Sequence, residues 1–224
     1  PSSREPLEGR TYKTALPVKL THEQKSSLKA IVEMLDKPDI NPRAILLYGV
    51  TGSGKTEVYL DSVQHCLEQG KKALVLVPEI ALTPQTIERF ASRFPGEIAV
   101  MHSGLSLGER FDQWWKIRGG EYGVVIGSRG AVFAPQPDLG LVVIDEEHEW
   151  TYKQNESNPK YHARDVSMQL AGITRAAVIL GSASPDIESY LRARRERYRF
   201  AKLTKRFLPE ARAQHGEGMD DLAT

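Results

Sequence analysis

The chain has 224 residues, of which 40% are hydrophobic and 26% charged, with a formal net charge of +1 at pH 7. These values fit a soluble globular domain and exclude a protein that coats DNA through a uniformly basic surface. No stretch approaches the ~20 apolar residues of a membrane helix, and the single cysteine, Cys66, excludes an internal disulfide or a cysteine-based zinc site.

The two ends differ in composition from the middle of the chain. Residues 1–19 are polar, contain Pro6 and Pro17, and predict a linker from an upstream domain; residues 205–224 predict a tail toward a missing second lobe. The first ten residues lack the apolar core of a secretory signal, and we expect a cytoplasmic protein. Because the chain does not begin with methionine, we expect an excised fragment whose folded domain is 20–204.

Apolar runs and amphipathic stretches alternate along this domain. Continuous apolar runs, typical of strands covered on both faces, lie at 44–48, 73–77, 98–101, 123–126, 141–144 and 176–180. Amphipathic helical stretches separate most of them, at 56–69, 83–94, 107–117, 162–171 and 186–195. Strands alternating with helices predict an α/β protein with a mainly parallel sheet. Trp114 and Trp115 lie in a helical pattern, and we expect at least one of them in the core.

A glycine-rich motif follows the first apolar run. It fits the P-loop pattern and consists of Gly49, Val50, Thr51, Gly52, Ser53, Gly54, Lys55 and Thr56. Glycines let backbone N–H groups approach phosphate oxygens, and the start of the following helix adds partial positive charge. Lys55 is predicted to contact the β- and γ-phosphates, and Thr56 to bind Mg²⁺. The motif predicts a nucleotide site of the P-loop NTPase type, but does not distinguish a motor from a kinase or a GTPase.

Acidic residues follow the apolar run 141–144. Asp145, Glu146, Glu147 and His148 stand where a Walker B strand ends. Carboxylates at a strand end are costly to bury unless a cation is present. By spacing, Asp145 is the predicted Mg²⁺ ligand and Glu146 the general base, so Lys55, Asp145 and Glu146 form the predicted catalytic set. The alternative is a solvated acidic turn.

Aromatic residues crowd the segment after the acidic box, at Trp150, Tyr152, Tyr161 and His162. Lys153 and Lys160 lie among them, and Asn158–Pro159 favours an irregular loop. Exposed aromatic rings beside cations suit base stacking and phosphate contact, which predicts a single-stranded DNA contact. The alternative is a loop that packs on its own domain. The basic run 192–206 leaves two options open in the same way, a solvated helix face or a phosphate-contacting surface.

The acidic box in a P-loop protein resembles motif II of superfamily-two helicases. Further segments resemble the replication-restart helicases of that superfamily: 49–60, 77–85, 102–105 with 109–110, 145–148 with 152–154, 161–165 and 180–185. The resemblance runs from about Leu20 to Thr204. It implies a RecA-like three-layer sandwich that serves as an ATP-dependent DNA helicase motor lobe, with 3′–5′ unwinding in the parent protein. The implied cofactors are ATP and Mg²⁺, with zinc only in the parent protein, and the implied partners are single-stranded and forked DNA, primosome proteins and single-strand-binding proteins.

Roles carry over by position. Gln24 resembles the adenine-reading glutamine. Residues that resemble DNA-binding or coupling positions are Pro78, Gln85, Arg129, His148, Trp150, Tyr152, Lys153, Tyr161, His162, Ser182 and Ser184. Three positions depart from the family pattern. Ser184 stands where threonine is usual, which keeps the hydroxyl. Gly130 replaces a serine, which removes one phosphate contact, and Trp150 is bulkier than expected.

The resemblance also implies what the chain lacks. A motor of this class works between two lobes, and the second supplies an arginine to the γ-phosphate. We therefore expect this lobe to bind nucleotide weakly, hydrolyse ATP slowly and not unwind DNA. Alternatives are a double-stranded DNA translocase motor, against which segments 152–154 and 161–165 argue, a non-hydrolysing module that binds ATP, DNA or a partner, and a small-molecule P-loop kinase.

Overall fold

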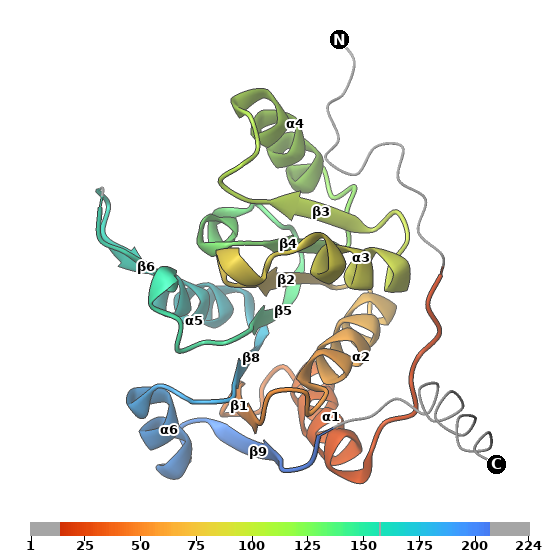
Figure 1. The fold of residues 1–224 in the computed structure, drawn as a ribbon, viewed down its shortest axis with the longest axis vertical. Helices are drawn as coiled ribbons and strands as arrows, with labels where there is room; N and C mark the ends of the chain where they lie inside the picture. Colours follow the sequence, from red (N-terminus) through yellow and green to blue (C-terminus); the bar gives the residue numbers. More distant parts are fainter. Residues whose placement is uncertain (1–13, 157, 207–224) are drawn as a thin grey trace, which may run out of the picture.

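The computed structural model describes residues 14–156 and 158–206, so most of the predicted linker and tail lies outside the described residues. Seven parallel strands form the central sheet in the order β3-β4-β2-β5-β8-β1-β9 (Figure 1). Their bounds are β1 (Ala44–Gly49), β2 (Lys72–Leu76), β3 (Ile98–Met101), β4 (Val124–Gly127), β5 (Leu139–Ile144), β8 (Ala177–Ser182) and β9 (Arg199–Leu203). The predicted parallel α/β sheet is confirmed.

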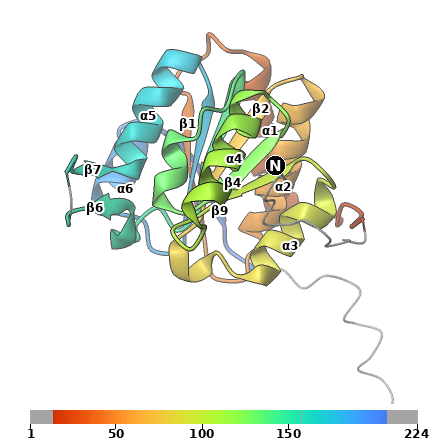
Figure 2. The same ribbon diagram turned by 90° about the horizontal axis from the view of Figure 1, so that it is seen from above.

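Helices cover both faces of the sheet, which makes three layers. On one face lie α1 (His22–Asp36), α2 (Lys55–Glu68) and α3 (Pro84–Arg93). On the other lie α4 (Leu107–Arg118), α5 (Ala163–Thr174) and α6 (Ile187–Arg194). The view from above separates α5 and α6 from α1 and α2 (Figure 2). Short 3₁₀ turns are η1 (Glu79–Ala81), η2 (Arg129–Phe133) and η3 (Trp150–Tyr152).

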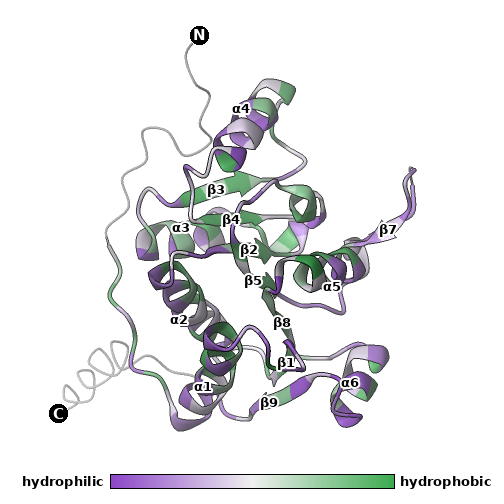
Figure 3. Ribbon diagram, turned by 180° about the vertical axis from the view of Figure 1, so that it is seen from behind, coloured by the Kyte–Doolittle hydropathy of each residue, from purple (hydrophilic) through white to green (hydrophobic). Residues whose placement is uncertain are grey.

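Strand β1 shows why the predicted strands are continuously apolar. Ile45 and Leu47 pack into the hydrophobic cluster under α1 and α2, whereas Ala44 and Leu46 pack into the cluster under α5 and α6. Successive strand residues point to opposite faces, and both faces are covered. The strands are accordingly the most hydrophobic part of the ribbon (Figure 3). Among the described residues, no helix is both long and apolar enough to cross a membrane.

Three elements were not predicted from the sequence. Helix α1 begins with a capping box between Thr21 and Gln24. Strand β9 is the edge strand beside β1, so the predicted basic run 192–206 divides between the end of α6 and this strand. The segment predicted as an irregular loop contains a two-stranded antiparallel hairpin, β6 (Lys153–Gln154) with β7 (Tyr161–His162).

The core position expected for one of the two tryptophans of α4 is wrong. Trp115 is half exposed and Trp114 is only partly buried, because Gln113 and Ile117 are the buried residues of this helix. The Arg118 guanidinium lies over both rings, 5.4 Å from the centre of Trp114 and 5.2 Å from that of Trp115.

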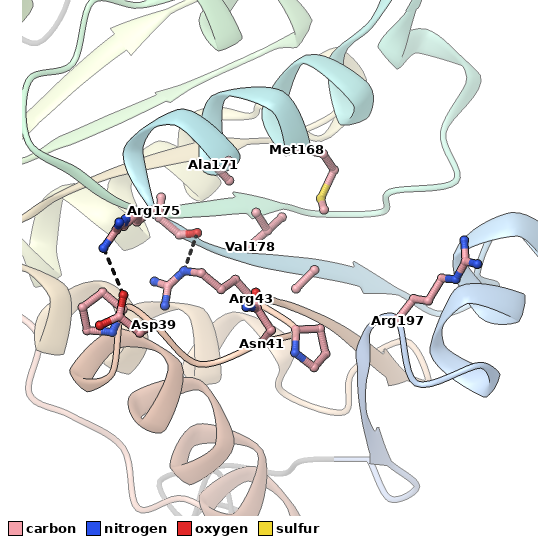
Figure 4. Close-up of a pocket in the computed structure, with 13 residues that line it drawn as sticks. Asp39, Asn41, Arg43, Met168, Ala171, Arg175, Val178 and Arg197 are labelled. Atoms are coloured by element: carbon pink, nitrogen blue, oxygen red, sulfur yellow. Dashed lines mark hydrogen bonds and ion pairs between the residues drawn. The ribbon is translucent and has the colours of Figure 1, made fainter.

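Because all seven strands are parallel, the loops divide between two ends of the sheet. At the amino end, a pocket of about 450 Å³ lies beside the starts of β1 and β8 (Figure 4). Arg43 donates hydrogen bonds there to the carbonyls of Met34 and Lys37, at the end of α1, and of Ala176, before β8. A cation at a helix carboxyl terminus offsets the partial negative charge of its carbonyls, which accounts for this arginine. The predicted site residues lie at the opposite, carboxyl end.

Candidate nucleotide and nucleic-acid sites

The predicted P-loop connects the end of β1 to the start of α2. Gly52 and Gly54 have φ of 78° and 81°, in the left-handed region that favours glycine. A Cβ at Gly49 would lie 2.5 Å from the Ser53 hydroxyl, so this position also requires glycine. The buried Ser53 hydroxyl has no hydrogen-bond partner among the described residues, and no side chain caps the start of α2. Unsatisfied donors around a glycine loop fit the oxygens of a phosphate chain.

Lys55 joins the P-loop to the acidic box. Its Nζ donates a 2.8 Å hydrogen bond to the carbonyl of Gly49 and lies 3.5 Å from Oε1 of Glu146. The lysine is almost fully buried. The glycine loop and the strand-end carboxylates therefore face each other, and a triphosphate between them would compete with Glu146 for the ammonium group.

Asp145 lies at the end of β5, beside α2. Its Oδ1 accepts a 2.9 Å hydrogen bond from the Tyr59 hydroxyl. Burial raises the pKa of the Asp145 carboxyl, and so does the charge of Glu146; the Tyr59 hydrogen bond and Lys55 oppose these effects less strongly. An ionised carboxylate that is disfavoured by burial and a like charge is one that a bound cation stabilises.

A Mg²⁺ ion would need more than protein ligands here. Among the described residues, no group of three or more His, Cys, Asp or Glu side chains is placed to hold a metal. Mg²⁺ is commonly held by one or two protein oxygens together with substrate phosphates and waters. Thr56, in the first turn of α2, and Asp145 fit such a set, and their metal roles remain predictions.

Glu146 has an uncommon backbone conformation, with φ of 45°. Its Oε2 accepts a hydrogen bond from the Ala183 N–H at 3.3 Å and lies 3.7 Å from Nδ1 of His148. A non-glycine residue at positive φ costs of order 1–3 kcal/mol and persists only where its surroundings enforce it. The conformation directs the carboxylate toward Lys55.

His148 connects the acidic box to the segment after β8. Its Nδ1 shares a 2.7 Å hydrogen bond with the Ser182 hydroxyl, and its Nε2 shares one of 3.2 Å with the Ser184 hydroxyl. The predicted coupling residues His148, Ser182 and Ser184 thus lie together. Serine at 184 supplies the hydroxyl to this contact.

Gln24 lies beside the P-loop, with its side chain fully buried. Its Nε2 donates to the Ser53 carbonyl at 3.0 Å, and its Oε1 accepts from the Thr21 N–H at 2.8 Å. The side chain therefore braces the P-loop against α1. The adenine contact predicted for Gln24 remains a prediction.

A second hollow, which we call the lateral hollow, lies beside the acidic box and has a volume of about 460 Å³. Its lining joins segments that are far apart in the sequence. It includes six of the predicted DNA-contact residues, namely Pro78, Arg129, Trp150, Tyr152, Lys153 and Tyr161. Glu79, His102, Ser103 and Arg110 also line it and were not predicted as site residues. Gln85, exposed in the first turn of α3, is not part of the lining.

The aromatic residues of the hollow divide into exposed and buried members. Trp150 is 78% exposed, whereas Tyr152 is fully buried. The expectation that Tyr152 is exposed for stacking is therefore wrong, because its ring packs in the core under α5. Its hydroxyl donates a 2.7 Å hydrogen bond to the backbone carbonyl of Asp145. Tyr152 thus touches the acidic box directly.

Two more predicted residues brace the loop around the hollow. The Arg129 guanidinium donates to the carbonyls of Thr151 at 3.1 Å and Lys153 at 3.0 Å. His162 caps the start of α5, where its Nδ1 accepts from the N–H of Arg164. Burial lowers the pKa of His162, which favours the neutral ring that this cap requires.

The sequence prediction missed Tyr59, which contacts Asp145, and Arg164, which contacts Glu147. Tyr59 lies four residues after Lys55 and hence on the same side of α2. That spacing is a signal available in the sequence. Arg164 lies 17 residues from Glu147, and only the topology brings the two together.

Comparison with known proteins identifies the family to which the chain belongs. Residues 21–192 match the DEAD/DEAH box helicase family. The chain belongs to that family. Among curated relatives, replication restart protein PriA of Bacillus subtilis is 48% identical over 203 residues, which cover 91% of this chain and 25% of that protein. PriA of Haemophilus influenzae is 47% identical over 72% of this chain and 22% of its own length. The chain thus spans about a quarter of these relatives.

Solved structures of other proteins that act on DNA share the fold. RecG bound to a three-way DNA junction aligns with a TM-score of 0.62 at 24% identity, over 87% of this chain and 25% of RecG. The helicase MrfA bound to DNA aligns with a TM-score of 0.60 at 19% identity, over 92% of this chain and 32% of MrfA. At these identities the likeness establishes the fold alone, that of a RecA-like α/β domain.

Proposed function

We propose that this chain is the first motor lobe of an ATP-dependent DNA helicase that acts in replication restart. It binds ATP and Mg²⁺ between the P-loop and the acidic box, and single-stranded DNA in the lateral hollow. One observation carries the proposal: Tyr152 belongs to the lining of the hollow and donates its hydroxyl hydrogen bond to Asp145 of the acidic box. Two sites that share a buried residue suit a motor, in which one ligand must alter the response to the other.

Each residue of the nucleotide site then has a defined task. Lys55 contacts the β- and γ-phosphates, and Thr56 and Asp145 hold Mg²⁺, which neutralises phosphate charge when bound. Glu146 accepts the proton of the attacking water as general base. Its approach to Lys55, at 3.5 Å, supports this assignment because the lysine marks where phosphate must lie.

Single-stranded DNA suits the chemistry of the lateral hollow. Trp150 offers an exposed ring for a base, and Lys153 an exposed cation for a phosphate. Stacking and cation contacts together are the usual means of binding single strands without sequence preference. The DNA-bound states of the related RecG and MrfA structures are consistent with this choice.

The organisation of the longer protein is part of the proposal. Residues 20–204 form lobe one, and a second lobe elsewhere supplies the arginine that completes hydrolysis. Alone, this lobe is expected to hydrolyse ATP slowly and not to unwind DNA. The likeness to replication restart protein PriA supports a role in replication restart. For the longer protein we further propose forked DNA, primosome proteins and single-strand-binding proteins as partners, 3′–5′ unwinding and a cytoplasmic location.

Fluorescent ATP and a labelled single-stranded oligonucleotide, each titrated alone and in the presence of the other, test the proposal. Lys55→Ala should weaken ATP binding but not oligonucleotide binding, and Lys29→Ala, at an exposed lysine of α1, should change neither. Trp150→Ala should weaken oligonucleotide binding but not ATP binding. If the oligonucleotide does not bind, or binds equally well to the Trp150→Ala variant, the DNA assignment fails. A P-loop kinase would bind ATP without any response to the oligonucleotide.

A further inference from the structure

The backbone of Glu146 has a positive φ, which the contacts of the nucleotide site alone do not explain. This residue holds a left-handed φ of 45° although it is not a glycine, and its own Cβ makes negative φ the local preference. Its own side-chain contacts are a 3.3 Å hydrogen bond from Ala183, a 3.5 Å ion pair with Lys55 and a 3.7 Å approach to Nδ1 of His148. A triphosphate would compete for Lys55. Contacts that a nucleotide does not displace must therefore help to hold the conformation.

Glu147, the next residue, is the most firmly held side chain of the acidic box. It is 1% exposed and accepts three hydrogen bonds. Oε1 accepts from the N–H of Asp186 at 2.8 Å, and Oε2 accepts from the Ser189 hydroxyl at 2.8 Å and from Nη1 of Arg164 at 3.2 Å. The Glu147 N–H also donates to the carbonyl of Gly181 at 2.9 Å. The side chain and the backbone of Glu147 are thus both fixed, and the side chain contacts residues of α5 and α6.

Arg164 is the only cation among these three donors. It is 8% exposed, and its second nitrogen, Nη2, donates to Glu188 at 3.2 Å. A buried carboxylate with its cation removed is strongly destabilised, because the charge is left in a medium that solvates it poorly. Arg164 belongs to the first turn of α5, directly after the hairpin strand β7.

We propose that Arg164 and Glu147 are positioning residues: their buried ion pair anchors the chain next to Glu146 and thereby holds the Glu146 carboxylate toward Lys55. The anchor lies on the α5–α6 face of the sheet, whereas the nucleotide lies at its carboxyl end, so neither residue touches substrate. Helices α5 and α6 thus hold Glu147, and through it they fix the position of the Glu146 carboxylate. This inference rests on the proposed function for the role of Glu146, but not for the geometry.

The first test is structural and does not need turnover. In a crystal structure of the Arg164→Met variant, we expect Glu146 to leave the left-handed region and its carboxylate to move away from Lys55. Arg175→Met is the matched control, since Arg175 follows the same helix and pairs with Asp39 in an exposed contact. In this control, Glu146 should keep its conformation. If Glu146 also keeps its φ and its 3.5 Å approach to Lys55 in Arg164→Met, the inference is overturned.

The second test separates positioning from general loosening. In Arg164→Met, at temperatures where the chain is folded, ATP–Mg affinity should stay within about threefold while turnover falls by about a hundredfold, the effect of a small displacement of a reacting group. Arg164→Lys, which keeps the charge, should lie between this variant and the unchanged chain. A parallel loss of affinity and turnover contradicts positioning. If the unchanged chain binds no ATP, the proposed function fails, and the crystal structures still decide the inference.

Discussion

Replacing Tyr59 with phenylalanine removes one hydroxyl from the centre of the candidate nucleotide site. The ring is fully buried on α2, and the substitution would remove its 2.9 Å hydrogen bond to Asp145. Lys55 lies one helical turn earlier and does not contact the Tyr59 hydroxyl, so we expect it to keep its position. We expect Mg²⁺-dependent nucleotide binding to weaken, since Asp145 loses the donor that favours its ionised form.

The magnitude follows from the type of bond. A hydrogen bond to a charged group contributes about 1.5–3 kcal/mol, and removal of a residue that orients a metal ligand typically lowers metal affinity by about 10–100-fold. Both estimates agree, since about 1.4 kcal/mol corresponds to tenfold in affinity. The Mg²⁺-dependent part of ATP affinity should therefore fall by about 10–100-fold, whereas affinity measured with EDTA should change little.

Isothermal titration with a non-hydrolysable ATP analogue, with Mg²⁺ and with EDTA, measures both quantities. Tyr198→Phe is the control: Tyr198 is also buried, and its hydroxyl accepts a 3.1 Å hydrogen bond from Arg192, remote from the acidic box. This variant should bind the analogue normally. An Mg²⁺-dependent affinity of Tyr59→Phe within twofold of the unchanged chain would refute the argument that Tyr59 orients Asp145.

Three further predictions concern stacking, the thiol and a close approach of strands. Trp150→Ala should weaken single-stranded DNA binding by about 1–3 kcal/mol without lowering the melting temperature, whereas Phe111→Ala, at an exposed ring outside the hollow, should not. Burial raises the pKa of Cys66 to about 12, so an alkylating reagent at pH 8 should leave it unmodified in the folded chain and label it fully in denaturant; labelling of the folded chain at the rate of a free thiol would contradict its burial. Gly127→Ala would place a Cβ 2.0 Å from a carbonyl oxygen of β3 and should cost about 3 kcal/mol or more, whereas Gly172→Ala, with open space around it, should be neutral or stabilising in thermal unfolding.

The predicted fold was accurate where burial on both faces leaves a plain pattern. The run 141–144 lies within β5, and 107–117 lies within α4. Helix α1 was missed although its capping box is visible in the sequence at Thr21 and Gln24. Strand β9 was missed because an edge strand alternates exposed and buried residues and here carries two cations, which resemble a solvated surface.

The candidate site was predictable to the extent that it is local in the chain. The P-loop pattern and the strand-end acids are contiguous, so their chemistry is readable from spacing. The burial of Tyr152 was not readable, because an aromatic residue between polar neighbours has the same pattern whether it stacks on a base or packs under a helix. The contact of Glu147 with Arg164 depends on how two helices meet one strand, which no local pattern encodes.

The candidate site residues lie at the carboxyl end of the parallel sheet, and the amino end lies on the opposite side of the domain. Arg175 and Asp39 are exposed at that far end, 69% and 86% by side chain, and form only a surface ion pair, which contributes little to stability. A cysteine introduced at either position is therefore a suitable attachment point for a dye or for tethering to a bead. The lone natural thiol is inaccessible, so such a probe would mark one defined place while nucleotide and DNA exchange at the opposite end.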